Sequence, residues 1–124
     1  MTRLVLLIVM TLCVLGSLTA PAVATDYCPI TSVQLGQFCD CVVWNYGPAA
    51  DTSVSIVVTA SGVAPHTCPP TTIAAGTVAS CGVAPTTSGY CACKVIGRGT
   101  TSRASLVVEA SNTDYTPLAV VPCQ

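Results

Sequence analysis

Cysteine is the residue type in this chain whose number and spacing point most directly to chemistry. The 124 residues contain nine cysteines, and four of them form two Cys-x-Cys pairs, one in FCDCVVWN (38–45) and one in GYCACKVIG (89–97). Thiols at this spacing could bind a soft metal ion, carry out redox exchange, or form disulfide bonds. The choice among these depends on the compartment of the protein and on the elements that hold the thiols.

The first 24 residues have the pattern of a secretory signal peptide. A short basic start precedes the almost wholly apolar run 4–18, and residues 22–24 supply the small-x-small triplet that a signal peptidase accepts. We therefore expect cleavage after this triplet, a secreted mature chain of residues 25–124, and loss of Cys13 with the leader. The apolar run is shorter than the roughly 20 residues of a membrane-spanning helix, so no membrane span is expected in the mature chain.

The mature chain keeps eight cysteines, an even set typical of a small secreted domain held by disulfides. A domain of about 100 residues buries only about two-thirds of its unfolded surface. Each native bridge contributes about 2 to 5 kcal/mol, so four bridges could decide whether the domain folds. The disulfide candidates are Cys28, Cys39, Cys41, Cys68, Cys81, Cys91, Cys93 and Cys123.

Short alternating runs predict an all-β fold for the mature chain. Apolar residues recur at every second position between Gly, Pro, Ser and Asn, and no helix is expected after residue 25. We expect one immunoglobulin-like antiparallel β-sandwich domain of about seven strands over residues 25–124, stapled by disulfides. The expected strands are 32–36, 38–45, 53–60, 77–82, 90–96, 102–110 and 116–121, with 61–70 among the turns between them.

Strand geometry favours bridges between the two Cys-x-Cys strands over bridges within them. Residues i and i+2 of a strand share a face with Cα atoms about 6.7 Å apart, at the far edge of disulfide range and with parallel Cβ vectors. Asp40 and Lys94 have the opposite parity to the cysteines and mark the wet face, which places the cysteines inside. The two strands are therefore expected to be pinned to one another across the core, although eight cysteines allow 105 pairings and spacing does not choose among them.

A four-cysteine metal site is the alternative interpretation of these pairs. Two thiolate pairs from two strands could surround Zn²⁺ or Cu⁺. The export signal argues against it, because oxidising compartments convert such thiols to disulfides, and neither a metal nor another cofactor is expected. A redox-active dithiol is disfavoured because the chain lacks Cys-x-x-Cys at a helix start.

The remaining polar residues do not suggest an enzyme. The only histidine, His66, falls in a predicted loop between prolines, and the five carboxylates are scattered singly. The chain has no glycine-rich phosphate loop and no nucleophile elbow. Its four Lys and Arg residues are not clustered, so a nucleic-acid partner is not expected either.

Phe38 and Trp44 are the candidates for a binding surface. They share the parity of Asp40 and are therefore placed on the outer face, where an exposed aromatic pair could contact an extracellular ligand or surface. The alternative is that a loop or a neighbouring strand covers them. If the other face of strand 38–45 pointed inward, both rings would be buried and the cysteines exposed. Only the position of Asp40 on the same face as the rings argues against this arrangement.

The order of motifs along the chain resembles that of a group of small exported bacterial β-sandwich proteins without assigned function. The motifs are CVVWNYG, TSVSIVV, IAAGTVAS, GYCACKVIG, SRASLVV and PLAVVP, and they cover about 38–122. The resemblance implies a sandwich fold, an exported location, and Cys41 to Cys91 as the shared inter-strand bridge. The other six cysteines of the mature chain depart from the group's pattern and suggest a more heavily stapled member.

The cysteine order (single, pair, single, single, pair, single) is similar to that of fungal hydrophobins, which coat air–water interfaces. The paired cysteines of hydrophobins are adjacent and so face opposite sides of a strand, whereas Cys-x-Cys faces one side, and their bonding cannot simply carry over. We therefore expect a secreted, non-enzymatic binding or structural module, with a surface-active coat protein and a metal-binding protein as alternatives.

Overall fold

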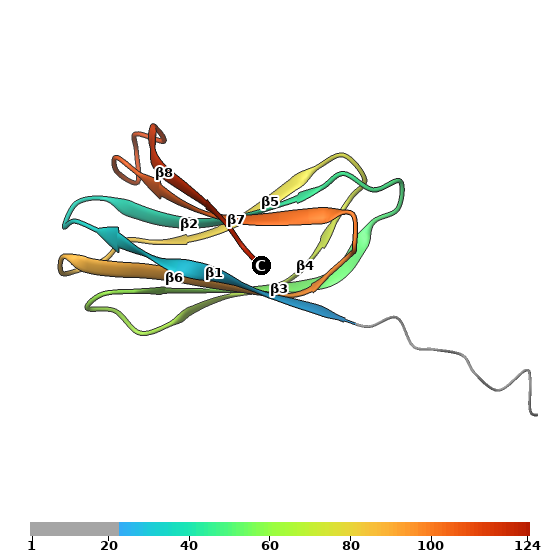
Figure 1. Cartoon of the computed structure of the whole chain (residues 1–124), viewed down its shortest axis with the longest axis horizontal. Helices are drawn as coiled ribbons and strands as arrows, with labels where there is room; N and C mark the ends of the chain where they lie inside the picture. Colours follow the sequence, from blue (N-terminus) through green and yellow to red (C-terminus); the bar gives the residue numbers. More distant parts are fainter. Residues whose placement is uncertain (1–22) are drawn as a thin grey trace, which may run out of the picture.

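The computed structural model describes residues 23–124, which form two antiparallel β-sheets packed face to face (Figure 1). The predicted all-β sandwich is confirmed, with eight strands in place of about seven. The strands are β1 (Ala24–Val33), β2 (Phe38–Asn45), β3 (Asp51–Ala60), β4 (His66–Ile73), β5 (Val78–Val83), β6 (Gly89–Arg98), β7 (Ser102–Glu109) and β8 (Pro117–Pro122). The predicted signal peptide falls almost wholly outside the described residues and stays a prediction. Within the described range, no helix is long and apolar enough to cross a membrane.

The chain passes repeatedly from one sheet to the other. The first sheet has the order β1-β6-β3-β4 and the second has the order β5-β2-β7-β8. Only the β3–β4 and β7–β8 connections stay within one sheet. Figure 1 shows the resulting two layers, with β2 and β6 in opposite layers. Each Cys-x-Cys strand therefore lies in the interior of its own sheet and faces the other across the core.

The core contains the residues that the alternation predicted. Cys39, Cys41 and Val43 of β2 are fully buried, as are Val54 and Val58 of β3, so the cysteine faces point inward. The buried hydrophobic residues of the described chain are all aliphatic or cysteine, with no aromatic ring among them. Disulfide bridges consequently occupy space that aromatic side chains fill in many sandwiches.

Two strands differ from the sequence prediction, and both lie at a sheet edge. β4 (His66–Ile73) occupies much of a region predicted to be a turn, and it contains Pro69 and Pro70. Prolines are tolerated at an edge where the nitrogen faces away from the partner strand, or at a bulge. The pairing of β3 with β4 is irregular between Val54 and Ile56, opposite these two prolines. β1 begins upstream of the predicted 32–36 segment and passes Pro29 at an irregularity in its pairing with β6.

Candidate functional site

All eight cysteines between residues 23 and 124 are paired, and every bridge joins the two sheets. The pairs are Cys28–Cys123, Cys39–Cys91, Cys41–Cys93 and Cys68–Cys81. Two bridges lie side by side between β2 and β6, with Cα–Cα distances of 6.1 and 6.0 Å. The other two close the open sides of the sandwich, one from β4 to β5 and one from β1 to the residue that follows β8.

The bridge from Cys41 to Cys91 that the resemblance implied is wrong. Cys41 bonds to Cys93, and Cys39 bonds to Cys91. The sequence separation is 52 in both cases, so the first cysteine of one pair meets the first of the other, and the second meets the second. The expectation that the two Cys-x-Cys strands pin the sheets together is confirmed.

Two groups of sulfur and nitrogen atoms are close enough to resemble metal-ligand sets. The ligand atoms of Cys28, Cys41 and Cys93 lie within 4.8 Å of one another, and so do those of His66, Cys68 and Cys81 in the second group. All of these sulfurs belong to disulfides. Because a metal is bound by the thiolate, neither group offers a thiolate set unless its bridges are reduced.

The two predicted surface aromatics lie on the outer face of β2 but do not meet. Phe38 is half-buried against Gly82 of β5, whereas Trp44 is 44% exposed near the other end of the strand. The structure pairs Trp44 with Tyr46 instead. Their rings are nearly parallel, with centroids 6.0 Å apart and planes 13° from parallel.

Asn45, which lies between Trp44 and Tyr46 in the sequence, is buried, and its side chain holds the backbone of the turn after β2. Asn45 has no exposed surface, and its Nδ2 donates to the carbonyls of Ala49 at 2.7 Å and Ile73 at 3.0 Å. Its Oδ1 accepts from the amide of Gly47 at 2.8 Å. These bonds hold the turn after β2 and its first residue, Tyr46, in one conformation. The rings on either side of Asn45 are therefore presented by a rigid backbone.

Two exposed residues on neighbouring strands lie in the same row of the sheet as Trp44. Trp44 lies opposite Val78 of β5 and opposite Arg103 of β7, and both side chains are exposed. Nη1 of Arg103 donates to the carbonyl of Ser102 at 3.1 Å, so the guanidinium is tethered to the backbone. We call Trp44, Tyr46, Val78 and Arg103 the aromatic platform. It combines two stacked rings, one exposed aliphatic side chain and one cation on the outer face of the second sheet.

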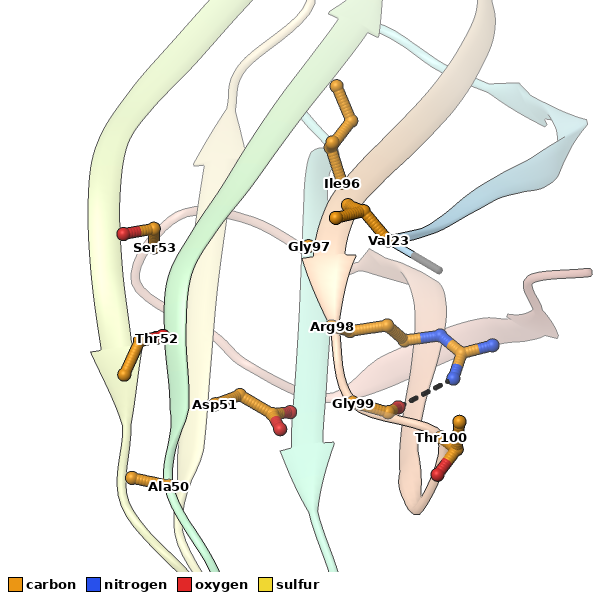
Figure 2. A pocket seen from close by; sticks show the side chains of 10 residues that line it. All are labelled: Val23, Ala50, Asp51, Thr52, Ser53, Ile96, Gly97, Arg98, Gly99 and Thr100. Atoms are coloured by element: carbon orange, nitrogen blue, oxygen red, sulfur yellow. Dashed lines mark hydrogen bonds between the residues drawn. The ribbon is translucent and has the colours of Figure 1, made fainter. Parts of the chain in front are cut away.

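A cavity of about 540 Å³ lies where the pairing of β3 and β6 ends. It is lined by Val23, Ala50, Asp51, Thr52, Ser53, Ile96, Gly97, Arg98, Gly99 and Thr100 (Figure 2). Pairing of the two strands ends at Ser55 and Ile96. Beyond that row, Ser53 and Gly97 both have positive φ angles, 58° and 87°, and regular pairing stops. The two backbones remain close there, since a Cβ on Gly97 would lie 3.0 Å from the carbonyl oxygen of Ser53. The cavity therefore lies where the regular ladder between β3 and β6 ends.

The charged groups around the cavity are engaged with other protein groups. Figure 2 shows the Arg98 side chain directed away from Asp51. Arg98 forms an ion pair with Asp26 and donates to the carbonyls of Gly99 at 2.9 Å and Ser102 at 3.0 Å. The carboxylate of Asp51 accepts a hydrogen bond from the hydroxyl of Ser102. These contacts hold the ends of β1, β3, β6 and β7 together.

Comparison with protein-family models, with curated proteins and with solved structures found no match to this chain.

The aromatic platform and the cavity differ in how far their side chains are already engaged with other protein groups. The platform presents two stacked rings with 44% of Trp44 and 67% of Tyr46 exposed, whereas Arg98 and Asp51 at the cavity are engaged in an ion pair and hydrogen bonds. The platform is therefore the better candidate for a binding site.

Two acidic residues lie on the outer face of the second sheet, near the opposite end of β2 from the platform. Burial raises the pKa of Asp40, opposed by hydrogen bonds from Ser80 and from the amides of Cys81 and Cys41. Burial, and then the charge of Asp40, raise the pKa of Glu109. Among the described residues, Oδ1 of Asp40 and Oε2 of Glu109 have no hydrogen-bond partner. This end of the sheet therefore carries an electrostatic cost when both groups are ionised.

Sequence reasoning found one of the four platform residues. Tyr46 falls in NYGPAAD, a stretch predicted to be a turn. It joins the platform because the hydrogen bond from the Gly47 amide to Asn45 Oδ1 fixes the backbone at this turn. Val78 and Arg103 become neighbours of Trp44 through pairing between strands distant in sequence. The alternation in sequence does place Arg103 on the outer face of its own strand, like Trp44. It does not indicate which residue of β2 Arg103 lies opposite.

Proposed function

We propose that the protein is a secreted, non-enzymatic binding module of immunoglobulin-like architecture, which contacts an extracellular partner through the aromatic platform. The observation that carries this proposal is the exposed stack of Trp44 and Tyr46 on either side of the buried Asn45. Rigid aromatic side chains give a large contact area and lose little conformational entropy on binding. The chemistry favours a partner with a flat apolar face.

Strand pairing supports the immunoglobulin-like part of the proposal. In an immunoglobulin domain strand B pairs with E, C pairs with F, and a disulfide joins B to F. Here β2 pairs with β5, β3 pairs with β6, and two disulfides join β2 to β6. β7 lies beside β2 in the place of strand A, and β1 lies beside β6 in the place of strand G, so the first and seventh strands have exchanged places relative to that domain.

The disulfides support the secreted location. Four bridges in about 100 residues persist in an oxidising compartment and are rare where thiols are kept reduced. The predicted signal peptide points to the same compartment.

The surface-active alternative requires apolar residues gathered on one side of the molecule. Trp44, Val78 and Val120 lie on the outer face of the second sheet, whereas Tyr27 and Ile30 lie on β1 of the first sheet. The charged residues Asp40, Arg103 and Glu109 interrupt the apolar residues of that outer face. This interruption favours the binding module over a surface-active coat protein.

The proposal is tested by binding measurements that use the platform's own fluorophore. Trp44 is the only tryptophan of the chain, so its emission reports directly on contact at the platform. Soluble extracellular polysaccharides and a displayed peptide library would be screened with the wild-type protein. Any ligand recovered would then be titrated against a variant carrying both Trp44→Ala and Tyr46→Ala, by calorimetry.

We expect the double variant to bind at least tenfold more weakly, because the anchor residues of an interface carry most of its affinity. Tyr115→Ala is the control, since Tyr115 lies outside the platform and is 69% exposed, close to the 67% of Tyr46. Equal affinity of the double variant and the wild-type protein for the recovered ligands would refute the platform as the site.

A further inference from the structure

Two of the four disulfides are direct neighbours in the core. Cys28 of β1 lies opposite Cys93 of β6 in the first sheet, and Cys41 of the second sheet is bonded to Cys93. As a result, the sulfurs of Cys28, Cys41 and Cys93 all lie within 4.8 Å of one another. Residues directly opposite in an antiparallel pair have Cα atoms about 4.5 to 5.5 Å apart, which is within the range that a disulfide can span. A bond between Cys28 and Cys93 is therefore compatible with the observed backbone.

The two neighbouring bridges differ in access from solvent. Cys28, Cys41 and Cys93 are buried, whereas Cys123, the partner of Cys28, is only half-buried next to the end of the chain. An external thiolate would therefore reach the sulfur of Cys123 before the other three. Its attack forms a mixed disulfide with Cys123 and releases Cys28 as a thiolate inside the sulfur cluster.

We propose that these two bridges form a thiol–disulfide exchange site, with Cys123 as the point of entry and Cys28 as the internal nucleophile. The Cys28 thiolate attacks the sulfur of Cys93, the Cys28–Cys93 bond forms, the Cys41–Cys93 bond breaks, and Cys41 leaves as the thiolate. One disulfide forms for each that breaks and the number of thiolates is unchanged. The only co-reactant is the small extracellular thiol that opened the first bridge.

The product would remain folded while changing its connectivity. The new Cys28–Cys93 bond lies within the first sheet, whereas both bonds that it replaces crossed between the sheets. Cys39–Cys91 is untouched and still joins β2 to β6. The exchange would therefore remove the covalent tie between β1 and Cys123, leave the backbone hydrogen bonds between Tyr27 and Gln124 as the remaining tie, and loosen one row of the core. This redox-sensitive site goes beyond the proposed binding function and does not depend on it.

The fourth bridge provides an internal control. Cys68–Cys81 also joins a half-buried sulfur to a buried one. In the part of the chain that the structure describes, the group around it contains His66 and no third cysteine. Opening that bridge leaves Cys81 with no disulfide of that group to attack.

The first test uses the wild-type protein. It would be incubated for hours with graded reduced glutathione, since uncatalysed rearrangement is slow, then quenched in acid, labelled with a maleimide and mapped by mass spectrometry. We expect molecules with glutathione on Cys123 to carry a Cys28–Cys93 bond and the maleimide on Cys41. Glutathione on Cys123 together with the maleimide on Cys28 and an intact Cys41–Cys93 bond would overturn the proposal.

The second test frees each buried partner by mutation. In Cys123→Ser, the maleimide should divide between Cys28 and Cys41, whereas in the matched Cys68→Ser variant it should stay on Cys81. A label found wholly on Cys28 in Cys123→Ser would contradict the exchange. If Cys123→Ser does not fold, the wild-type experiment decides the question by itself.

Discussion

The two faces of β2 differ in how deeply their side chains are buried and in how fully they are bonded or packed. The inner face, which has no exposed surface at any position, consists of Cys39, Cys41, Val43 and Asn45. The outer face, which is half-buried or exposed, consists of Phe38, Asp40, Val42 and Trp44. Inner residues are bonded or tightly packed, whereas the outer face includes a carboxylate oxygen without a partner. Alternate residues of one strand therefore carry separate tasks: the inner set holds the sheets together, and the outer set is free to meet a ligand.

The largest expected effect comes from removing both central bridges of the inner face. A variant in which Cys39, Cys41, Cys91 and Cys93 are all alanine opens a loop of 52 residues, which costs about 4 kcal/mol in chain entropy alone. Removing only Cys41 and Cys93 should cost about 2 kcal/mol, because the neighbouring bridge still closes the long loop. Urea unfolding without reductant measures both values. Equal losses of unfolding free energy in the two variants would mean that Cys39–Cys91 does not compensate for the absence of Cys41–Cys93.

Asn45→Ala is expected to be the next most damaging change to the inner face. It leaves the carbonyls of Ala49 and Ile73 and the amide of Gly47 without their side-chain partner. Loss of about 2 to 3 kcal/mol follows, since each buried polar group left unpaired costs about 1 to 3 kcal/mol and part of the turn can rehydrate. Thermal unfolding gives the stability change. Asn45→Asp should cost at least as much at neutral pH, because it places a fully buried carboxylate oxygen against the carbonyl oxygens of Ala49 and Ile73.

On the outer face, the carboxyl groups should make the protein more stable in mild acid than at neutral pH. The folded state raises the pKa of Asp40 and Glu109, so it binds protons more tightly than the unfolded chain, and stability falls as pH rises through the raised pKa values. Asp114 acts in the opposite direction, because hydrogen bonds from Thr116 lower its pKa. Its effect is confined to pH values below the ordinary carboxyl range of about 4.

Glu109→Gln tests this explanation directly. Glu109 is only 7% exposed, and neutralising it should stabilise the fold at pH 7 by on the order of 1 kcal/mol, because it removes the burial of a charge and the repulsion from Asp40. The difference between urea midpoints at pH 5 and pH 7 should also shrink in this variant. A wild-type protein that gains stability between pH 5 and pH 7 would contradict the assigned direction.

Trp44→Ala should have the smallest effect on stability of these changes. The side chain is 44% exposed and lies on the outer face, so the free energy of unfolding should change by about 0.5 kcal/mol or less. Circular dichroism would follow unfolding, because the variant lacks the fluorophore. A loss above about 1 kcal/mol would mean that Trp44 supports the fold, and the separation between the two faces of β2 would no longer hold.

The inner face was predictable from sequence because it follows from local alternation. Asp40 and Lys94 marked the wet faces of their strands, and this parity identified the buried cysteines before any pairing was known. Their partners could not be identified in the same way. Which cysteine of one pair meets which of the other depends on how far one sheet is shifted over the other, and a shift of two residues would have joined Cys41 to Cys91.

The outer surface was less predictable because it depends on contacts between distant segments. β4 contains Pro69 and Pro70, which argue against a strand unless its position at the edge is known. The turn that places Tyr46 is held by Asn45, whose partner Ile73 is 28 residues away. Local periodicity contains no information about either relation.

The bridge between Cys28 and Cys123 also has a mechanical consequence. It spans 95 residues and encloses nearly all of the described fold. Tension applied to the chain on either side of the bridge would pass through its covalent bond, so the hydrogen bonds of the enclosed strands would carry almost none of the load. Under a pulling force the domain would act as a link of fixed length, and it would extend only after the bridge was cleaved. The availability of thiols, and not the strength of strand pairing, would then set its compliance.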